Sequence, residues 1–152
     1  MLDFREITLS DVDKVLEIEE ECFAAPWKRD DFVDLATKDD RTYLVMTLDG
    51  EIIGGAAIRN IVGEGEITNV EITEGKRSCG YSHELMKALL KKGKEMGCSA
   101  FTLEVRKSNM PARKCYEGAG FLEEGIRPNF YSNPKEDAVI MWIRDISKVI
   151  ID

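Results

Sequence analysis

The chain has 152 residues, 43% of them hydrophobic and 33% charged, and its formal net charge is -8. This balance predicts one soluble globular domain that is large enough to bury a core, and it excludes a disordered chain. The negative charge argues against direct binding of nucleic acid, because nucleic-acid-binding proteins carry a basic face. It suits a cationic partner, such as an amine or a basic protein segment.

Membrane and secretion signals are not recognisable in the sequence. No apolar run approaches the roughly 20 residues that a membrane span needs, and the first residues lack the basic flank and apolar stretch of a signal peptide. We therefore expect a cytoplasmic protein that does not bind membranes. The four cysteines form no CxxC pair and there is one histidine, so we expect free thiols and no metal site. The cysteines are Cys22, Cys79, Cys98 and Cys115.

The N-terminal half predicts a strand, two helices and three antiparallel strands. Ser10 is expected to cap the first helix, and Pro26-Trp27 breaks the chain after it. Asp49-Gly50 is a strong hairpin signal, and Gly54-Gly55 in the next strand indicates a bulge or a close backbone approach. The expected elements are a strand at 2–7, a helix at 10–23, a short helix at about 32–38, and strands at 42–47, 51–61 and 66–72, with a turn at 63–65.

Residues 70–82 join a strand to a helix through a basic turn that contains glycine. The amides of such a loop and the dipole of the following helix favour a bound anion such as a phosphate. The same pattern is equally typical of a turn that uses glycine for steric reasons. Cys79 lies beside Lys76 and Arg77, which would favour its thiolate, although a small residue filling a turn is the simpler interpretation.

The C-terminal half predicts alternating strands and helices. The helix between the strands that end at residue 72 and begin at residue 100 predicts a right-handed crossover and a parallel pairing of those strands. The remaining elements are a helix at 81–97, a strand at 100–106, a helix capped by Ser108-Asn109, and strands at 121–126 and 138–143, with a polar loop at 127–137. The fold class is therefore α/β, a single domain over 1–152 with a mixed, mostly antiparallel sheet and a central parallel strand pair flanked by helices.

The turn of residues 70–82 carries the first motif of a known family. Arg77-x-x-Gly80-x-Ser82 resembles the acyl-CoA signature Gln/Arg-x-x-Gly-x-Gly/Ala of the GNAT acetyltransferases. Three positions depart from the family. Ser78 and Cys79 stand where a second basic residue is usual, which puts the hold on the pyrophosphate in doubt, and Ser82 replaces glycine or alanine.

A second motif supports the resemblance. The block Asn109-x-x-Ala112-x-x-x-Tyr116-x-x-x-Gly120-Phe121 is similar to the second conserved block of that family. The resemblance covers nearly the whole chain, from the first strand to the last, and it implies a single-domain GNAT fold that transfers an acetyl group from acetyl-CoA to an amine.

Three further patterns resemble the GNAT branch that acetylates protein N-termini, ribosomal proteins among its acceptors. They are Pro26-Trp27, the segment 103–109 and the segment 127–138. The implied partners are thus acetyl-CoA and a peptide or protein N-terminus. Two alternatives stay open, namely a GNAT enzyme for a small amine or a lysine side chain, and a CoA-binding module without catalysis.

The resemblance also implies roles for single residues. Glu104 would be the general base and Tyr116 the general acid that protonates the thiolate, although from the residues alone Glu104 is a solvated strand glutamate and Tyr116 a core tyrosine. Trp27 and Tyr131 would line the acceptor channel. His83 lies in the first turn of a helix, and no pattern supports a Ser-His-Asp site. The implied cofactor contacts are Val70, Glu71, Ile72, Arg77, Ser78, Cys79, Gly80, Tyr81, Ser82 and Asn109.

Overall fold

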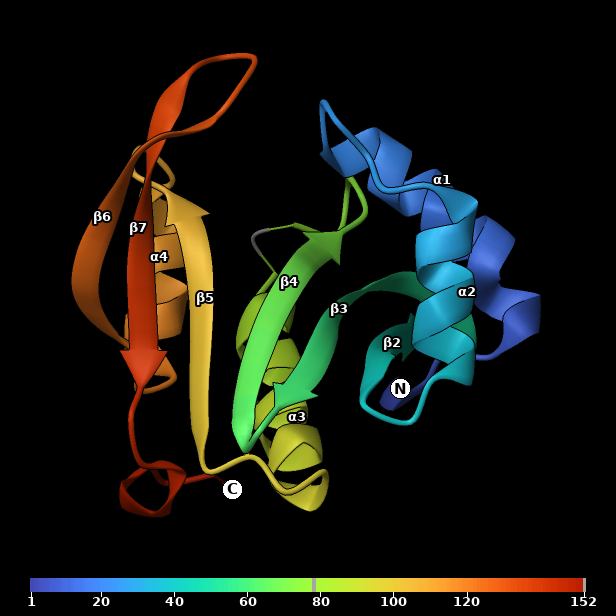
Figure 1. The fold of residues 1–152 in the computed structure, drawn as a ribbon. Helices are drawn as coiled ribbons and strands as arrows, with labels where there is room; N and C mark the ends of the chain where they lie inside the picture. Colours follow the sequence, from blue (N-terminus) through green and yellow to red (C-terminus); the bar gives the residue numbers. More distant parts are fainter. Residues whose placement is uncertain (78, 152) are drawn as a thin grey trace.

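A computed structural model describes residues 1–77 and 79–151. Seven strands form one sheet in the order β1-β2-β3-β4-β5-β7-β6 (Figure 1). The strands are β1 (Leu2–Glu6), β2 (Arg41–Leu48), β3 (Glu51–Ile61), β4 (Glu64–Ile72), β5 (Ala100–Arg106), β6 (Leu122–Tyr131) and β7 (Glu136–Ile143). The helices are α1 (Val12–Cys22), α2 (Arg29–Thr37), α3 (Tyr81–Glu95) and α4 (Met110–Gly118), with short 3-10 turns η1 (Leu9–Asp11) and η2 (Ile146–Lys148).

The strand pairings confirm the predicted mixed sheet. Strands β4 and β5 are parallel, and α3 forms the crossover between them. The other neighbouring strands pair antiparallel. The α/β class predicted from the sequence is therefore confirmed.

Helices cover both faces of the sheet (Figure 1). On one face, α1 and α2 pack on a cluster that contains Val15, Phe32 and Tyr43. On the other face, α3 and α4 pack on a larger cluster that contains Leu89 and Phe101. Each helix presents an apolar stripe to the sheet and a charged stripe to solvent, which is why the chain forms three layers.

Strands β4 and β5 stay paired over only three residues each. Glu64–Glu66 pair with Ala100–Thr102, although β4 continues to Ile72 and β5 to Arg106. Toward their C-terminal ends the two strands diverge (Figure 1). Beyond Glu66, the edge of β4 that faces β5 has no ladder partner among the described residues. A free strand edge in the middle of a sheet is an acceptor for another extended chain.

Several element boundaries differ from the sequence prediction. The predicted loop at 127–137 is wrong in its first part, because β6 runs on to Tyr131 and β7 begins at Glu136. Thr8 and Asp11, rather than Ser10, form the capping box before α1. The turn predicted at 63–65 begins earlier, because Val62 and Gly63 both have positive φ and form its corner.

Two general features complete the fold. Within the described residues, no helix is long and apolar enough to cross a membrane. The four cysteines are free, as predicted.

Candidate active site

Strand β5 presents alternate side chains to the two faces of the sheet, as predicted. Leu103 and Val105 are buried in the core beneath α3 and α4. Thr102, Glu104 and Arg106 are half-buried on the opposite face, which is the α1 and α2 side. The register sets Glu104 opposite Ile140 of β7.

Glu104 is held by a cation from the neighbouring strand. Arg127 Nη2 of β6 lies 3.3 Å from Glu104 Oε1. The second oxygen, Oε2, is buried and has no hydrogen-bond partner among the described residues. A buried carboxylate oxygen without a donor is an acceptor that a water or a substrate N–H can satisfy.

Tyr131 lies beside Glu104 at the end of β6. Its ring is half-buried, and the guanidinium carbon of Arg106 is 4.5 Å from the ring centre. Burial, and then the nearby carboxylate of Glu104, raise the pKa of Tyr131 to about 12, against the opposing effect of Arg106. Tyr131 therefore remains a neutral phenol that can donate a hydrogen bond.

Tyr116 lies on the opposite face of the sheet from Glu104. It belongs to the core beneath α3 and α4, is 8% exposed, and packs edge-on against Phe121 with ring centres 6.1 Å apart. Burial raises the pKa of Tyr116, and the neighbouring Cys115 and Tyr131 raise it further. The hydroxyl keeps its proton at neutral pH, so it can act as a donor.

The free edge of β4 contains a bulge. The register with β3 moves from Thr68 opposite Ala57 to Glu71 opposite Gly55, so Asn69 and Val70 form the bulge. Asn69 is in the left-handed region with φ of 54°, which asparagine tolerates better than most residues.

Close backbone approach at Gly54-Gly55, predicted from the sequence, is confirmed. A Cβ on Gly54 would clash with the carbonyl oxygen of Glu71. At the end of β4, the carbonyl of Ile72 accepts a hydrogen bond from Arg77 Nε at 2.9 Å. Val70 and Ile72, two of the residues predicted to contact the cofactor, thus lie on the part of β4 that diverges from β5.

The turn after β4 leads into α3 through a left-handed glycine. Gly80 has φ of 81°, and open space surrounds the position of a Cβ there. Among the described residues, no side chain caps α3, whose first residue is Tyr81. The first amides of the helix are therefore free for an anion. Ser82 lies in the first turn, and Ser78 lies outside the described residues.

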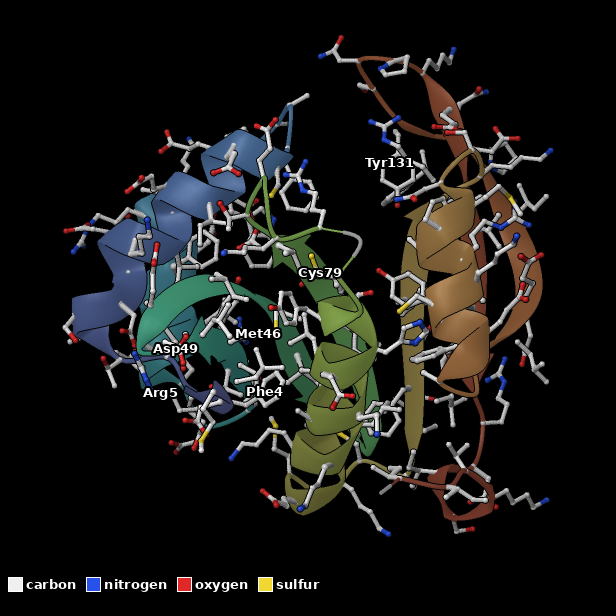
Figure 2. The ribbon with its side chains drawn as sticks, turned by 180° about the vertical axis from the view of Figure 1, so that it is seen from behind. Phe4, Arg5, Met46, Asp49, Cys79 and Tyr131 are labelled. Atoms are coloured by element: carbon white, nitrogen blue, oxygen red, sulfur yellow. The ribbon has the colours of Figure 1, made fainter. Side chains whose placement is uncertain are left out.

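The basic side chain of this turn points toward α1. Arg77 Nη2 donates to Cys22 Sγ at 3.2 Å and lies 3.9 Å from Glu21 Oε1. The exposed Cys79 contacts the carbonyl of Arg77. Figure 2 shows Cys79 at the start of α3 and Tyr131 on the side of the molecule where β4 and β5 diverge.

Two other predicted residues have simple local roles. Asn109 caps α4 by accepting a hydrogen bond from the Ala112 amide at 3.3 Å, as the sequence predicted. His83 lies beside Gly118 of α4. Among the described residues, no group of three His, Cys, Asp or Glu side chains is placed to hold a metal ion.

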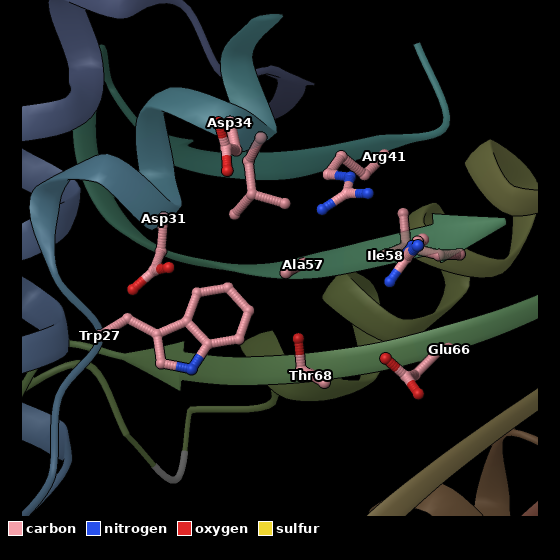
Figure 3. Close-up of a pocket in the computed structure, with 10 residues that line it drawn as sticks. Trp27, Asp31, Asp34, Arg41, Ala57, Ile58, Glu66 and Thr68 are labelled. Atoms are coloured by element: carbon pink, nitrogen blue, oxygen red, sulfur yellow. The ribbon is translucent and has the colours of Figure 1, made fainter. Parts of the chain in front are cut away.

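Trp27 lies in the loop between α1 and α2. Its indole packs on Phe32, with ring centres 5.9 Å apart, and it also lines a pocket of about 210 Å³. In Figure 3, Trp27 closes one end of this pocket and Glu66 lies at the other, with Thr68 of β4 between them. Trp27 is thus both a core contact and a pocket wall.

The sequence did not predict one ion pair and two buried acids of the site. Arg127 lies in the segment 127–138 but had no expected role, because its pairing with Glu104 depends on the register of β6 and β7. Glu19 and Glu71 were not expected to be buried. The signal for Glu19 was a charge at a helical spacing from Val12 and Val15, on the stripe that faces the core.

Comparison with known proteins agrees with this geometry. A model of the acetyltransferase (GNAT) family matches residues 12–121. A Bacillus subtilis protein, provisionally assigned as a ribosomal protein bS18-alanine N-acetyltransferase, is 36% identical over 140 residues, which are 91% of this chain and 93% of that protein. The Haemophilus influenzae ribosomal protein bS18-alanine N-acetyltransferase is 34% identical over 90% of this chain and 94% of its own length.

A solved structure extends the agreement to the fold. The ribosomal-protein-S18-alanine N-acetyltransferase of Escherichia coli superposes with a TM-score of 0.85 at 26% identity, over 94% of this chain and 93% of that one. The split between β4 and β5, the two sequence motifs and these matches lead to one conclusion: the chain belongs to the GNAT acetyltransferase family.

Proposed function

We propose that this N-acetyltransferase uses acetyl-CoA to acetylate the α-amine of a protein N-terminus, namely the N-terminal alanine of ribosomal protein bS18. Two observations support the acceptor: the relatives in B. subtilis and H. influenzae match over nearly their full length, and both names specify this substrate. Membership of the GNAT family supports the donor.

The residues beside the split fit an acyl-CoA. The free edge of β4 over Val70–Ile72 offers backbone groups to an extended amide chain, apart from the Ile72 carbonyl that Arg77 occupies. The uncapped start of α3 offers N–H groups to a diphosphate. Arg77 to Ser82 and Asn109 are the proposed contacts around them. When bound, acetyl-CoA would supply an activated acetyl thioester, and one N–H of residues 70–72 would donate to its carbonyl.

The observation that carries the proposal is the placement of Glu104 and Tyr116 on opposite faces of the sheet. Glu104 is on the face of the sheet that carries α1 and α2, with one buried oxygen lacking a donor among the described residues. It would accept the proton of the attacking amine directly or through a water. Tyr116 keeps its proton in the core and would release it to the leaving thiolate. Base and acid therefore do not compete for one proton.

If the acceptor is an α-amine, Glu104 has to remove a proton from only part of the acceptor molecules before attack. With an ordinary pKa near 7.7–8, roughly a tenth of an α-amine is already neutral at pH 7, whereas a lysine is neutral to about one part in a few thousand. Trp27, in the loop between α1 and α2, and Tyr131, at the end of β6, would flank the acceptor from either side.

The test is incubation with acetyl-CoA and a panel of acceptors, followed by mass spectrometry of the products. The panel contains a bS18 N-terminal peptide that begins with alanine, the same peptide with a formylated N-terminus and an internal lysine, and small amines such as polyamines. Acetylation of only the free N-terminus supports the proposal. Products from free amines or from the blocked peptide alone would contradict it, and CoA binding without any product would indicate a module without catalysis.

A further inference from the structure

Two acidic side chains are buried together under the bulge of β4. Glu19 of α1 is 1% exposed and Glu71 of β4 is 3% exposed. No lysine or arginine among the described residues forms an ion pair with either one. Buried carboxyl groups without a cation need donors or a proton, since burying a bare charge is costly.

Glu71 has one donor and one empty oxygen. Tyr43 of β2 donates its hydroxyl to Glu71 Oε1 at 2.6 Å, while Glu71 Oε2 is buried without a partner among the described residues. The ring of Tyr43 reaches across β3 because residue 55 is a glycine, where a Cβ would lie 2.7 Å from Tyr43 Cζ. Glu71 is therefore placed to carry a proton on Oε2.

Glu19 has the opposite surroundings. Its two oxygens accept from Asn69 Nδ2 at 3.0 Å each, and Oε2 also accepts from the backbone N–H of Trp27 at 3.0 Å. Three donor contacts thus hold the carboxyl group of Glu19 between the β4 bulge and the loop of Trp27. Burial, and then hydrogen bonding and repulsion from Glu19, raise the pKa of Glu71 to about 10, with an opposing effect of Tyr43. Glu71 therefore holds a proton at neutral pH.

The Glu19 carboxylate joins the two sides of the candidate active site. Asn69 is the left-handed residue of the β4 bulge, next to the edge proposed for the thioester. Trp27 belongs to the loop proposed for the acceptor. We propose that Glu19, through its hydrogen bonds to Asn69 and to the backbone of Trp27, is a positioning residue that fixes the acceptor loop against the thioester strand. This inference rests on the proposed function.

Few other titratable groups face the pair. They are Tyr43 from β2 and Cys22 from α1, and burial is the main cause that raises the pKa of each. Arg77 contacts Cys22, and β3 contributes Gly54 and Gly55, which carry no side chain.

The activity test compares two glutamate-to-glutamine changes on the same helix. Glu19→Gln should lower kcat/KM for the acceptor peptide by ~10²-fold, because a displacement of about 1 Å at the reacting groups costs that much. The Kd for acetyl-CoA, measured by calorimetry, should change by less than about twofold, since this variant disturbs mainly the acceptor side. Glu20→Gln, at an exposed position without a side-chain contact among the described residues, is the matched control and should leave both values unchanged. An unchanged kcat/KM in folded Glu19→Gln would overturn the positioning role.

A second readout does not depend on activity. The carboxyl ¹³C signal of Glu71, assigned with Glu71→Gln, should titrate near pH 10 and belong to a protonated group at neutral pH. A signal that titrates near the ordinary pKa of a glutamate would overturn the assignment of a proton to Glu71. If the wild-type protein acetylates no acceptor, the proposed function and the positioning role both fail, while this signal still reports the proton on Glu71.

Discussion

Replacing Glu71 with glutamine should stabilise the protein at neutral and alkaline pH. A glutamine keeps an oxygen to accept from Tyr43 and gains an amide to donate to Glu19, so it mimics the protonated side chain without needing a proton. The wild-type protein must take up that proton on folding, because the pKa of Glu71 rises from its ordinary 4.5 to about 10.

The magnitude follows from the difference between those two pKa values. At pH values between 4.5 and about 10, Glu71 binds more protons in the folded state than in the unfolded state. The contribution of Glu71 to the free energy of unfolding is therefore greatest below pH 4.5 and falls as the pH rises toward 10. At about pH 7.5, three units above the ordinary value, the loss is ~4 kcal/mol. The second amide hydrogen of glutamine would lack an acceptor and cost ~1–3 kcal/mol. The net gain at that pH is therefore ~1–3 kcal/mol.

Urea unfolding at a series of pH values measures this gain. The difference in free energy of unfolding between Glu71→Gln and wild type should grow by ~1.4 kcal/mol per pH unit between about pH 5 and pH 9. Below about pH 4.5 its sign should reverse, because the wild-type carboxyl is then protonated in both states. Glu20→Gln should show neither trend. A difference that stays constant across this range would refute the assignment of the proton to Glu71.

Three further substitutions test the catalytic roles and the packing. Tyr116→Phe should lower kcat by ~10²-fold with nearly unchanged acetyl-CoA affinity, and unchanged turnover would refute the acid role. Glu104→Gln should lose most activity at pH 7 and recover partly at higher pH, where the amine is already neutral, whereas a flat loss across pH would indicate a structural role. Gly55→Ala should destabilise the protein by ~1–3 kcal/mol in urea unfolding, because the added methyl group overlaps the ring of Tyr43, and an unchanged free energy of unfolding would contradict that packing.

The features that the sequence predicted well are set by local chemistry. Alternation of apolar and polar residues along 100–106 predicted which side chains of β5 face the core. Asn109 capped the helix at the expected residue, because its short amide side chain reaches the free amides of the first turn. The crossover helix between two strands determined their parallel pairing.

The error in β6 also has a physical reason. Pro128 and Asn129 usually interrupt a strand, and Asn129 indeed has φ of 54°. The strand continues because β6 lies at the edge of the sheet, where a missing amide donor costs little, and because the register with β7 shifts between Arg127 and Tyr131. Edge position is a property of the tertiary fold, so a local pattern did not contain it.

The buried acid pair could not be predicted for a different reason. Glu19 and Asn69 are 50 residues apart, and their contact forms only after α1 has packed on the sheet. The Tyr43 contact with Glu71 further requires the gap left by Gly55. A sequence pattern can indicate that a charged residue lies on a buried stripe. Whether its carboxyl group is protonated depends on the hydrogen-bond donors around its two oxygens, which only the three-dimensional structure gives.

The arrangement of the site explains why the loop of Trp27, which is proposed to contact the acceptor, needs a side chain that holds it in position. Tyr116 and the start of α3 belong to the large core, which fixes the proposed acid and cofactor contacts without further help. Trp27 belongs to a short loop between two helices that pack on the smaller core. A carboxylate that binds both the Trp27 amide and the β4 bulge ties this loop to the strand where the split begins. Because no cation lies against that carboxylate among the described residues, the three hydrogen bonds from Asn69 and Trp27 set its position, so the geometry of the acceptor loop depends on the contacts of this one side chain.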